Sequence, residues 1–263
     1  GSYCVLPLGN FTTYLYPCNW DLGNKGEVQL ETIKLILSGF FISGFLLSQQ
    51  YSISIFGFHA ADVNLIRDST STEFKTNNRG LFDFIWPTSN MYRTSFNQTD
   101  HSVKNWNKAI KQGPYETTLS GTLNTDGYME YKDNKTIKIK SGTHTIFTML
   151  ELVNSRDKEY LDTKWFSYEH EGSLGRARFI WADSSNQWTG QDSVSCDHYR
   201  FDIEINDSTQ YIRTNDYFMN NIINPGCIRE LWISKTNPKR IILAKISIKS
   251  IPVLARIQID KET

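Results

Sequence analysis

Apolar and polar residues alternate with a period of two in five separate segments of this chain, 51–56, 136–140, 201–205, 245–249 and 255–259. Successive side chains of a β-strand point to opposite faces, so each segment has one face for a core and one for water. Gly, Asn, Asp and Pro clusters such as 77–80, 126–127 and 224–226 separate the alternating segments as turns do. The pattern predicts an all-β protein built from antiparallel sheets, of the sandwich or jelly-roll type.

Helices and domain boundaries are less clearly indicated by the sequence than strands are. Only two short segments favour a helix, 102–111 and 216–223. The polar stretch 154–159 is the best candidate boundary, between a β-sandwich domain at 1–153 and a region at 160–263. That second region is either another β domain or the second half of the same sandwich. Two aromatic segments with the Phe-Ile-Trp pattern, 81–86 and 178–181, are expected as strands and favour two related halves.

Four cysteines occur, and they lie near the two ends of the chain. An even number without a CxxC spacing favours disulfides over metal binding. The expected bridges are Cys4–Cys18 and Cys196–Cys227, in an extracellular protein or ectodomain. Four buried, unpaired thiols in a cytosolic protein are the alternative, because a free cysteine packs as a small apolar side chain.

Charge and hydropathy narrow the range of partners. Lys and Arg together number 28, as do Asp and Glu, so the formal net charge is zero. This balance argues against nucleic acid as a partner, since the phosphate backbone is bound by clustered positive charge. The most apolar stretch, 36–47, is too short and too interrupted by Ser and Gly to span a bilayer, and we expect buried strands there rather than membrane insertion. The oligomeric state is left open.

Four Asn-X-Ser/Thr triplets are candidate N-glycosylation sites, at Asn10, Asn97, Asn134 and Asn206. They fit a secreted glycoprotein. Chance pairing of the many Asn, Ser and Thr residues in this chain predicts a similar number of triplets.

One region resembles a known family. The segments 58–65, 81–86 with Asn90 and Ser95, 127–131 and 135–139 follow one another in order. They are similar to the β-sandwich domain named after farnesoic acid O-methyltransferase, over about 51–140. Trp86 lacks the Gly-Gly that precedes it in that family, and the later hairpin has no Trp. The resemblance implies a secreted β-sandwich recognition module, with no catalytic residues to transfer and no cofactor.

Catalytic candidates are few. Asp202 and Glu204 project from one face of the alternating segment 201–205, and paired carboxylates are what glycosidic hydrolysis uses. A solvated strand face explains the same residues, and we expect both carboxylates to be exposed while Phe201, Ile203 and Ile205 face the core. The histidines are scattered; Cys196 and His198 could supply two metal ligands, but no second pair has matching spacing, so no metal is expected.

Aromatic residues in turn-rich segments are the better indication of a site. Trp165, Tyr168, Trp181 and Trp188 lie near Asn, Gln and Asp residues, a mixture that suits sugar stacking or a protein contact. Packing in the core is the alternative for each ring. The sequence thus predicts a non-catalytic, secreted or surface recognition glycoprotein that binds a glycan or an extracellular protein. A secreted glycosidase that uses Asp202 and Glu204 is the alternative.

Overall fold

The fold is that of a computed structural model, which describes residues 47–206, 216–248 and 250–259. These residues all belong to one compact unit, Leu46–Thr263. Cys4, Cys18, Asn10 and the apolar stretch 36–46 lie outside the described residues.

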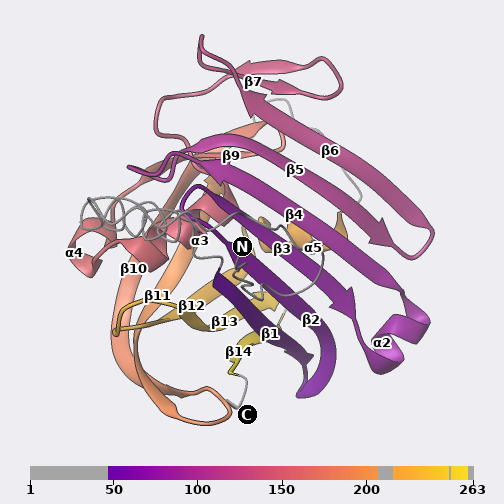
Figure 1. The fold of residues 1–263 in the computed structure, drawn as a ribbon, viewed down its shortest axis with the longest axis vertical. Helices are drawn as coiled ribbons and strands as arrows, with labels where there is room; N and C mark the ends of the chain where they lie inside the picture. The colour runs from indigo at the N-terminus through magenta and orange to yellow at the C-terminus, as the bar shows by residue number, and fades with distance from the viewer. Residues whose placement is uncertain (1–46, 207–215, 249, 260–263) are drawn as a thin grey trace, which may run out of the picture. The chain divides into compact units, whose positions relative to one another are not determined.

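Fourteen strands and four short helices make up the described part of the chain (Figure 1). The strands are β1 (Leu47–Ile55), β2 (Phe58–Arg67), β3 (Ser71–Asn78), β4 (Thr88–Phe96), β5 (Val103–Gln112), β6 (Tyr115–Leu123), β7 (Tyr128–Tyr131), β8 (Thr136–Lys138), β9 (Phe166–His170), β10 (Ser173–Trp188), β11 (Ser193–Ile205), β12 (Ile228–Ser234), β13 (Ile241–Ile248) and β14 (Ile251–Gln258). The helices are α2 (Gly80–Ile85), α3 (Ile146–Ser155), α4 (Lys158–Leu161) and α5 (Tyr217–Ile222). The predicted antiparallel all-β class is confirmed.

All fourteen strands join one antiparallel sheet in the order β8-β7-β6-β5-β4-β3-β2-β1-β14-β13-β12-β11-β10-β9. Strands β1 to β8 form one meander, the first run, and strands β9 to β14 form another, the second run. The pairing of β1 with β14, with Ile53 opposite Ala255, joins the two runs. Figure 1 shows β1 to β6 side by side, with the orange and yellow strands β10 to β14 forming the other part of the sheet. The segment 154–159 joins α3 to α4 inside this unit, so the sheet does not divide there into two domains.

The main core lies between the two runs of strands and encloses α3. It combines Leu65 and Tyr92 from the first run, Phe179 and Leu231 from the second, and Leu152 from α3. Thr145 and Thr148 begin α3 with reciprocal side-chain to backbone hydrogen bonds, a capping box that satisfies two free N–H groups. Phe147 anchors the helix on the first run, with its ring centroid 5.0 Å from that of Phe74.

Two predictions of local structure are wrong: a predicted helix is a strand, and a predicted strand is a helix. The segment 102–111, expected as a helix, is β5, hydrogen-bonded on both sides to β4 and β6. The segment 81–86, expected as a strand, is α2 and the residue after it. Strand β3 ends at Asn78, Gly80 begins the helix with a φ of 55°, and Pro87 precedes β4. The expected helix at 216–223 is confirmed as α5 with its N-cap Asp216, and 178–181 is a strand within β10.

The predicted bridge between Cys196 and Cys227 is wrong. Both cysteines are free and buried. Cys196 on β11 pairs with Ser234 at the end of β12, whereas Cys227 precedes Ile228 at its start. A strand of 7 residues spans about 23 Å, far beyond the Cα separation of about 7 Å that a disulfide tolerates. Burial raises the pKa of the Cys196 thiol to about 11.

Candidate ligand-binding cavity

An apolar cavity of about 200 Å³ lies between the sheet, α3 and α5. Strands β1 to β4 line one side, and β12 to β14 line the other. The lining is almost wholly apolar: Tyr51, Ile53, Val63, Leu65, Phe74, Thr76, Asn90, Tyr92, Ile146, Phe147, Leu150, Phe218, Met219, Ile222, Leu231, Ile241, Ala244 and Ala255. An engineered cavity of about 150 Å³ with such a lining stays dry and binds benzene, so this space suits an apolar group.

Two small side chains form part of the cavity wall. Ala244 of β13 and Ala255 of β14 are directly opposite one another in the antiparallel ladder, and both line the cavity. Neighbouring wall positions carry Leu231 and Ile53. Larger side chains at the alanine positions would occupy the space that the present residues leave.

A second, smaller cavity of about 30 Å³ adjoins the first. The two share Tyr92, Ile146, Phe147 and Met219 in their walls. The remaining lining of the second cavity comes mainly from β4, β5, β9 and the turn after β9. It includes Thr94, Trp106, Asn107, Lys108, Thr145, Glu169, His170 and Glu171. The apolar space thus ends against buried polar groups.

A buried ionic cluster stands at this polar end. Lys108 forms salt bridges with both Glu171 and Asp216, and its Nζ lies 3.2 Å from Oδ2 of Asp216. The side chains of Lys108, Glu171 and Asp216 are 3%, 5% and 0% exposed. Charges this deeply buried persist only when paired and hydrogen-bonded, because each has lost its hydration.

Asp216 connects the cluster to α5 and to the cavity wall. It accepts a hydrogen bond from the N–H of Met219 at 3.2 Å, and so caps α5. The Tyr92 hydroxyl donates to the same carboxylate, at 3.2 and 3.1 Å from its two oxygens. Burial and the nearby Asp216 charge raise the pKa of Tyr92, which keeps this hydroxyl a donor.

Glu169 is a further buried carboxyl beside the cluster. It accepts hydrogen bonds from the Tyr131 hydroxyl at 2.8 Å and from the Gly172 N–H at 2.9 Å. Burial nevertheless raises its pKa to about 7, because desolvation of the carboxylate outweighs these bonds. Burial also lowers the pKa of the neighbouring His170, so its ring is neutral near pH 7.

The four predicted binding aromatics are not gathered into one site. Tyr168 is 1% exposed and belongs to the main core. The guanidinium groups of Arg176 and Arg178 lie 4.2 and 4.3 Å from the ring centroid of Trp165, where a sugar would otherwise stack. Trp181 packs against the core and donates to Asp197, and exposed Trp188 lies at the far end of the 16-residue strand β10.

The carboxylate pair on β11 follows the predicted alternation. Phe201 and Ile203 are buried and Ile205 packs against the core, while Glu204 is exposed. Asp202 is only partly exposed, and it forms salt bridges with Arg178 and Arg200. Arg176 pairs with Glu204.

Two of the glycosylation candidates are in open positions. Asn134 and Asn206 are exposed, and Asn97 is half-buried in the turn after β4.

In the described part of the chain, no three His, Cys, Asp or Glu side chains come together as a metal site requires. Nor does any described helix have the length and hydropathy needed to cross a membrane.

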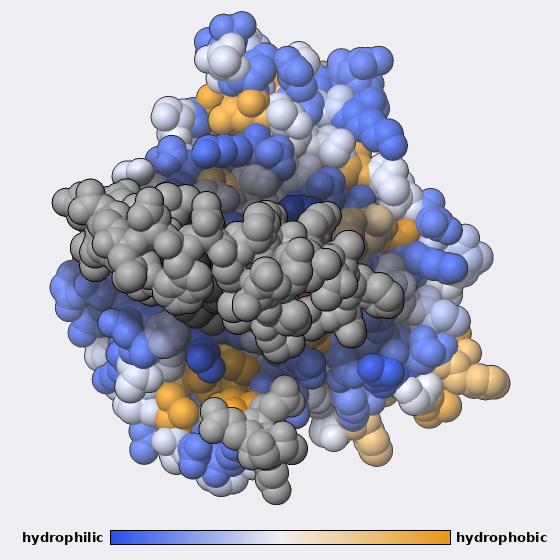
Figure 2. All heavy atoms as spheres, in the orientation of Figure 1, coloured by the Kyte–Doolittle hydropathy of each residue, from blue (hydrophilic) through white to orange (hydrophobic). Residues whose placement is uncertain are grey.

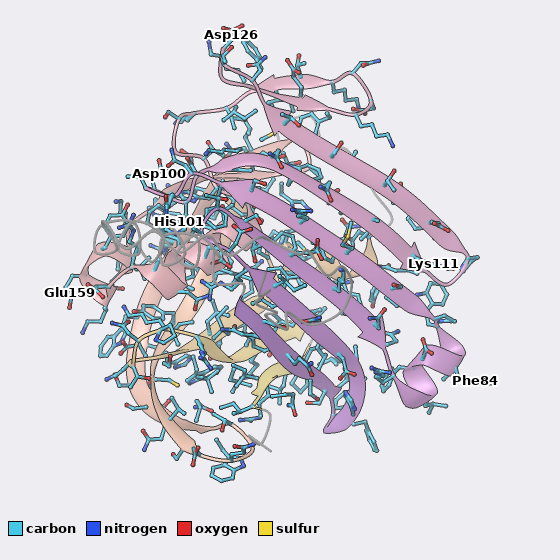
Figure 3. All side chains as sticks on the ribbon, viewed as in Figure 1. Phe84, Asp100, His101, Lys111, Asp126 and Glu159 are labelled. Atoms are coloured by element: carbon cyan, nitrogen blue, oxygen red, sulfur yellow. The ribbon has the colours of Figure 1, made fainter. Side chains whose placement is uncertain are left out.

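Large apolar side chains are also exposed at one end of the sheet. They belong to the β1–β2 turn, the start of β2, and α2 with its C-cap. A hydrogen bond from the N–H of Arg79, the N-cap of α2, to the Ala60 carbonyl joins the helix to β2. The residues are Phe56, Phe58, Leu81, Phe84, Ile85 and Trp86. Phe84 is 87% exposed and points away from the sheet (Figure 3), and Figure 2 shows hydrophobic residues at the lower right, where Figure 1 places α2.

Sequence reasoning missed the cavity and its polar end. A strand interpretation of 103–112 would have placed Trp106, Lys108 and Ile110 on one inward face, and would have marked Lys108 as a buried charge. Asp216 was visible only as the start of a short helix, and no local pattern indicated that Glu171 would meet it. Both depend on pairings between residues far apart in the chain.

Comparison with known proteins extends to the fold alone. No protein-family model matches the chain, and no curated protein does. A crystal structure from Brucella abortus, described as a β-barrel-like protein of domain of unknown function DUF1849, is similar with a TM-score of 0.51. The two chains are 10% identical, and the match covers 84% of this chain and 100% of the other. The resemblance to the farnesoic acid O-methyltransferase-like domain stays a prediction.

Proposed function

We propose that this protein is a non-catalytic binding protein that holds the apolar part of a small ligand in the cavity between the sheet, α3 and α5. The observation that carries the proposal is the cavity of about 200 Å³ with its almost wholly apolar lining. A cavity in a close-packed interior forfeits dispersion contacts unless something fills it. Ligand sites are typically such concave, mainly apolar spaces with a few polar groups at one end.

The proposal retains the non-catalytic binding role expected from the sequence and changes the ligand class. The predicted aromatic residues are dispersed or stacked against arginines, so they offer no shared platform for a glycan. Asp202 and Glu204 are engaged by arginines on the solvent side of β11, an arrangement that gives the glycosidase alternative no support. Secretion and glycosylation stay predictions.

A fluorescent apolar probe, N-phenyl-1-naphthylamine, tests the proposal by titration. We expect saturable binding to the native chain and at least a tenfold weaker affinity for Ala244→Leu, because the added side chain fills the cavity. Ala182→Leu makes the same change at an exposed position of β10 and should leave the affinity unchanged. Absence of binding to the native chain, or equal affinities for the two variants, would contradict the proposal.

A further inference from the structure

Most of the large apolar side chains that the described residues expose lie at one end of the sheet. There β1, β3, β5 and β13 finish, and β2, β4, β6, β12 and β14 begin. Nine of the twelve exposed residues of this kind belong to that end and form the apolar rim: Phe56, Phe58, Leu81, Phe84, Ile85, Trp86, Tyr217, Ile228 and Ile251. Trp188 and Tyr128 lie at the opposite end, by the register of β10 with β11 and of β6 with β7. Such residues are normally scattered singly over a monomer, so this grouping marks an interaction surface.

Hydrogen bonds hold the backbone beneath the apolar rim in place. The Asn78 side chain donates to the Trp86 carbonyl at 2.8 Å, which fixes the end of α2 against β3. The N–H of Tyr217 donates to the Gln112 side chain at 3.2 Å, which fixes α5 at the end of β5. α2 projects from the sheet (Figure 1), and Phe84 points away from it (Figure 3). The rim therefore presents its side chains outward on an anchored backbone.

The charge around the apolar rim is nearly balanced. Among the described Lys, Arg, Asp and Glu residues, Arg79 and Lys111 are the exposed cations beside it. Asp83 and Glu116 are the exposed anions, and Arg79 pairs with the partly exposed Asp62. A strongly charged partner of either sign finds no complement here. A zwitterionic phospholipid surface has no net charge, and Trp and Phe side chains are favoured at its interface with water.

α5 joins the apolar rim to the ligand cavity. Phe218 and Met219 line the cavity, whereas Tyr217, the first residue of the helix, belongs to the rim. Tyr217 and Trp86 line an open hollow of about 650 Å³ at the same end. Apolar molecules leave water for apolar surroundings, so a bilayer is where the proposed ligands accumulate. A bilayer against the rim would therefore bring the cavity close to its ligands.

We propose that the apolar rim docks this protein on the surface of a zwitterionic phospholipid bilayer. The Phe, Trp and Ile side chains enter the interfacial layer, and the sheet stays in water. Burial of apolar surface drives the docking, so it depends little on salt or on anionic lipid. The choice of a bilayer over a second copy of this chain rests in part on the proposed function.

Flotation with phosphatidylcholine vesicles tests the inference. We expect the native chain to float with the vesicles equally in about 0.05 M and about 0.5 M NaCl, although screening differs widely between the two. Phe84→Ser should weaken the lipid affinity at least tenfold, because burial of one Phe side chain contributes an effect of about that size. This side chain is 87% exposed, so the variant should keep the urea unfolding midpoint of the native chain. Trp188→Ser removes an exposed ring at the opposite end and should leave the lipid affinity unchanged.

Vesicles with brominated acyl chains locate the contact, since bromine quenches Trp fluorescence at close approach. Trp86 is the Trp residue of the apolar rim. We expect quenching in the native chain and its loss in Trp86→Phe, which keeps an aromatic ring at the same position.

Three results would overturn the inference: no flotation of the native chain, an equal loss of affinity in Phe84→Ser and Trp188→Ser, or flotation that requires anionic lipid. A dimer in light scattering that dissociates in Phe84→Ser, without vesicle binding, would assign the rim to a second copy of this chain instead. Titration with N-phenyl-1-naphthylamine tests the cavity separately, without vesicles, so the docking and the proposed function can fail independently.

Discussion

Glu169 shows how the polar end of the cavity would make stability depend on pH. Its pKa is raised by burial from 4.5 to about 7. Tyr131 of β7, Trp106 and Lys108 of β5, and the adjacent His170 and Glu171 are the polar and charged groups around it. Between these two pH values the folded chain binds more protons at this site than the unfolded chain does. The free energy of unfolding therefore falls as pH rises.

The shift predicts a contribution of about 3 kcal/mol, present below pH 4.5 and lost as pH rises to about 7. Glu169→Gln carries a neutral side chain at every pH, so its free energy of unfolding lacks this pH-dependent contribution. Urea unfolding of both proteins at several pH values measures it: the stability of the native chain relative to the variant should fall by about 3 kcal/mol between pH 4.5 and 7. A difference that stays constant across this range would mean that Glu169 ionises as an exposed carboxyl does.

At the scale of secondary structure, the alternating segments were predictable because each strand has one buried and one wet face. The helix α2 was not, since its apolar residues face solvent and its sequence imitates a strand. The inward Lys108 broke the apolar face of β5 and concealed that strand. α3 was missed because it is enclosed by the core, with buried residues that include Glu151 and Asn154 as well as Leu152. Its partners come from strands distant in sequence.

α3 offers a comparison of two leucines that differ only in their surroundings. Leu152 is fully buried in the core, whereas Leu150 is partly buried and borders the apolar cavity. Leu152→Ala should cost about 3 kcal/mol of unfolding free energy, since it creates a new cavity in packed surroundings. Leu150→Ala should cost markedly less, because its side chain already faces open space. Equal losses in denaturant unfolding would show that the space beside Leu150 is filled in the native protein.

For the whole unit, the pairing of β1 with β14 brings the two meanders into one sheet, and this closure creates the cavity. No local segment contains the cavity: its wall runs from Tyr51 to Ala255. That long-range assembly is why the sequence indicated the fold class but not the site. The similarity to the Brucella abortus structure concerns the fold alone.

Diffraction from crystals soaked with a short bromoalkane tests whether apolar ligands occupy the cavity, because the anomalous signal locates the bromine. We expect a peak inside the apolar cavity, between Phe147 of α3 and Phe218 of α5, and the loss of that peak in Ala244→Leu. The exposed apolar residues of α2 provide the internal comparison. A peak only beside Phe84, or an empty cavity in crystals that bind the bromoalkane elsewhere, would contradict the claim that this protein binds apolar ligands within its sheet.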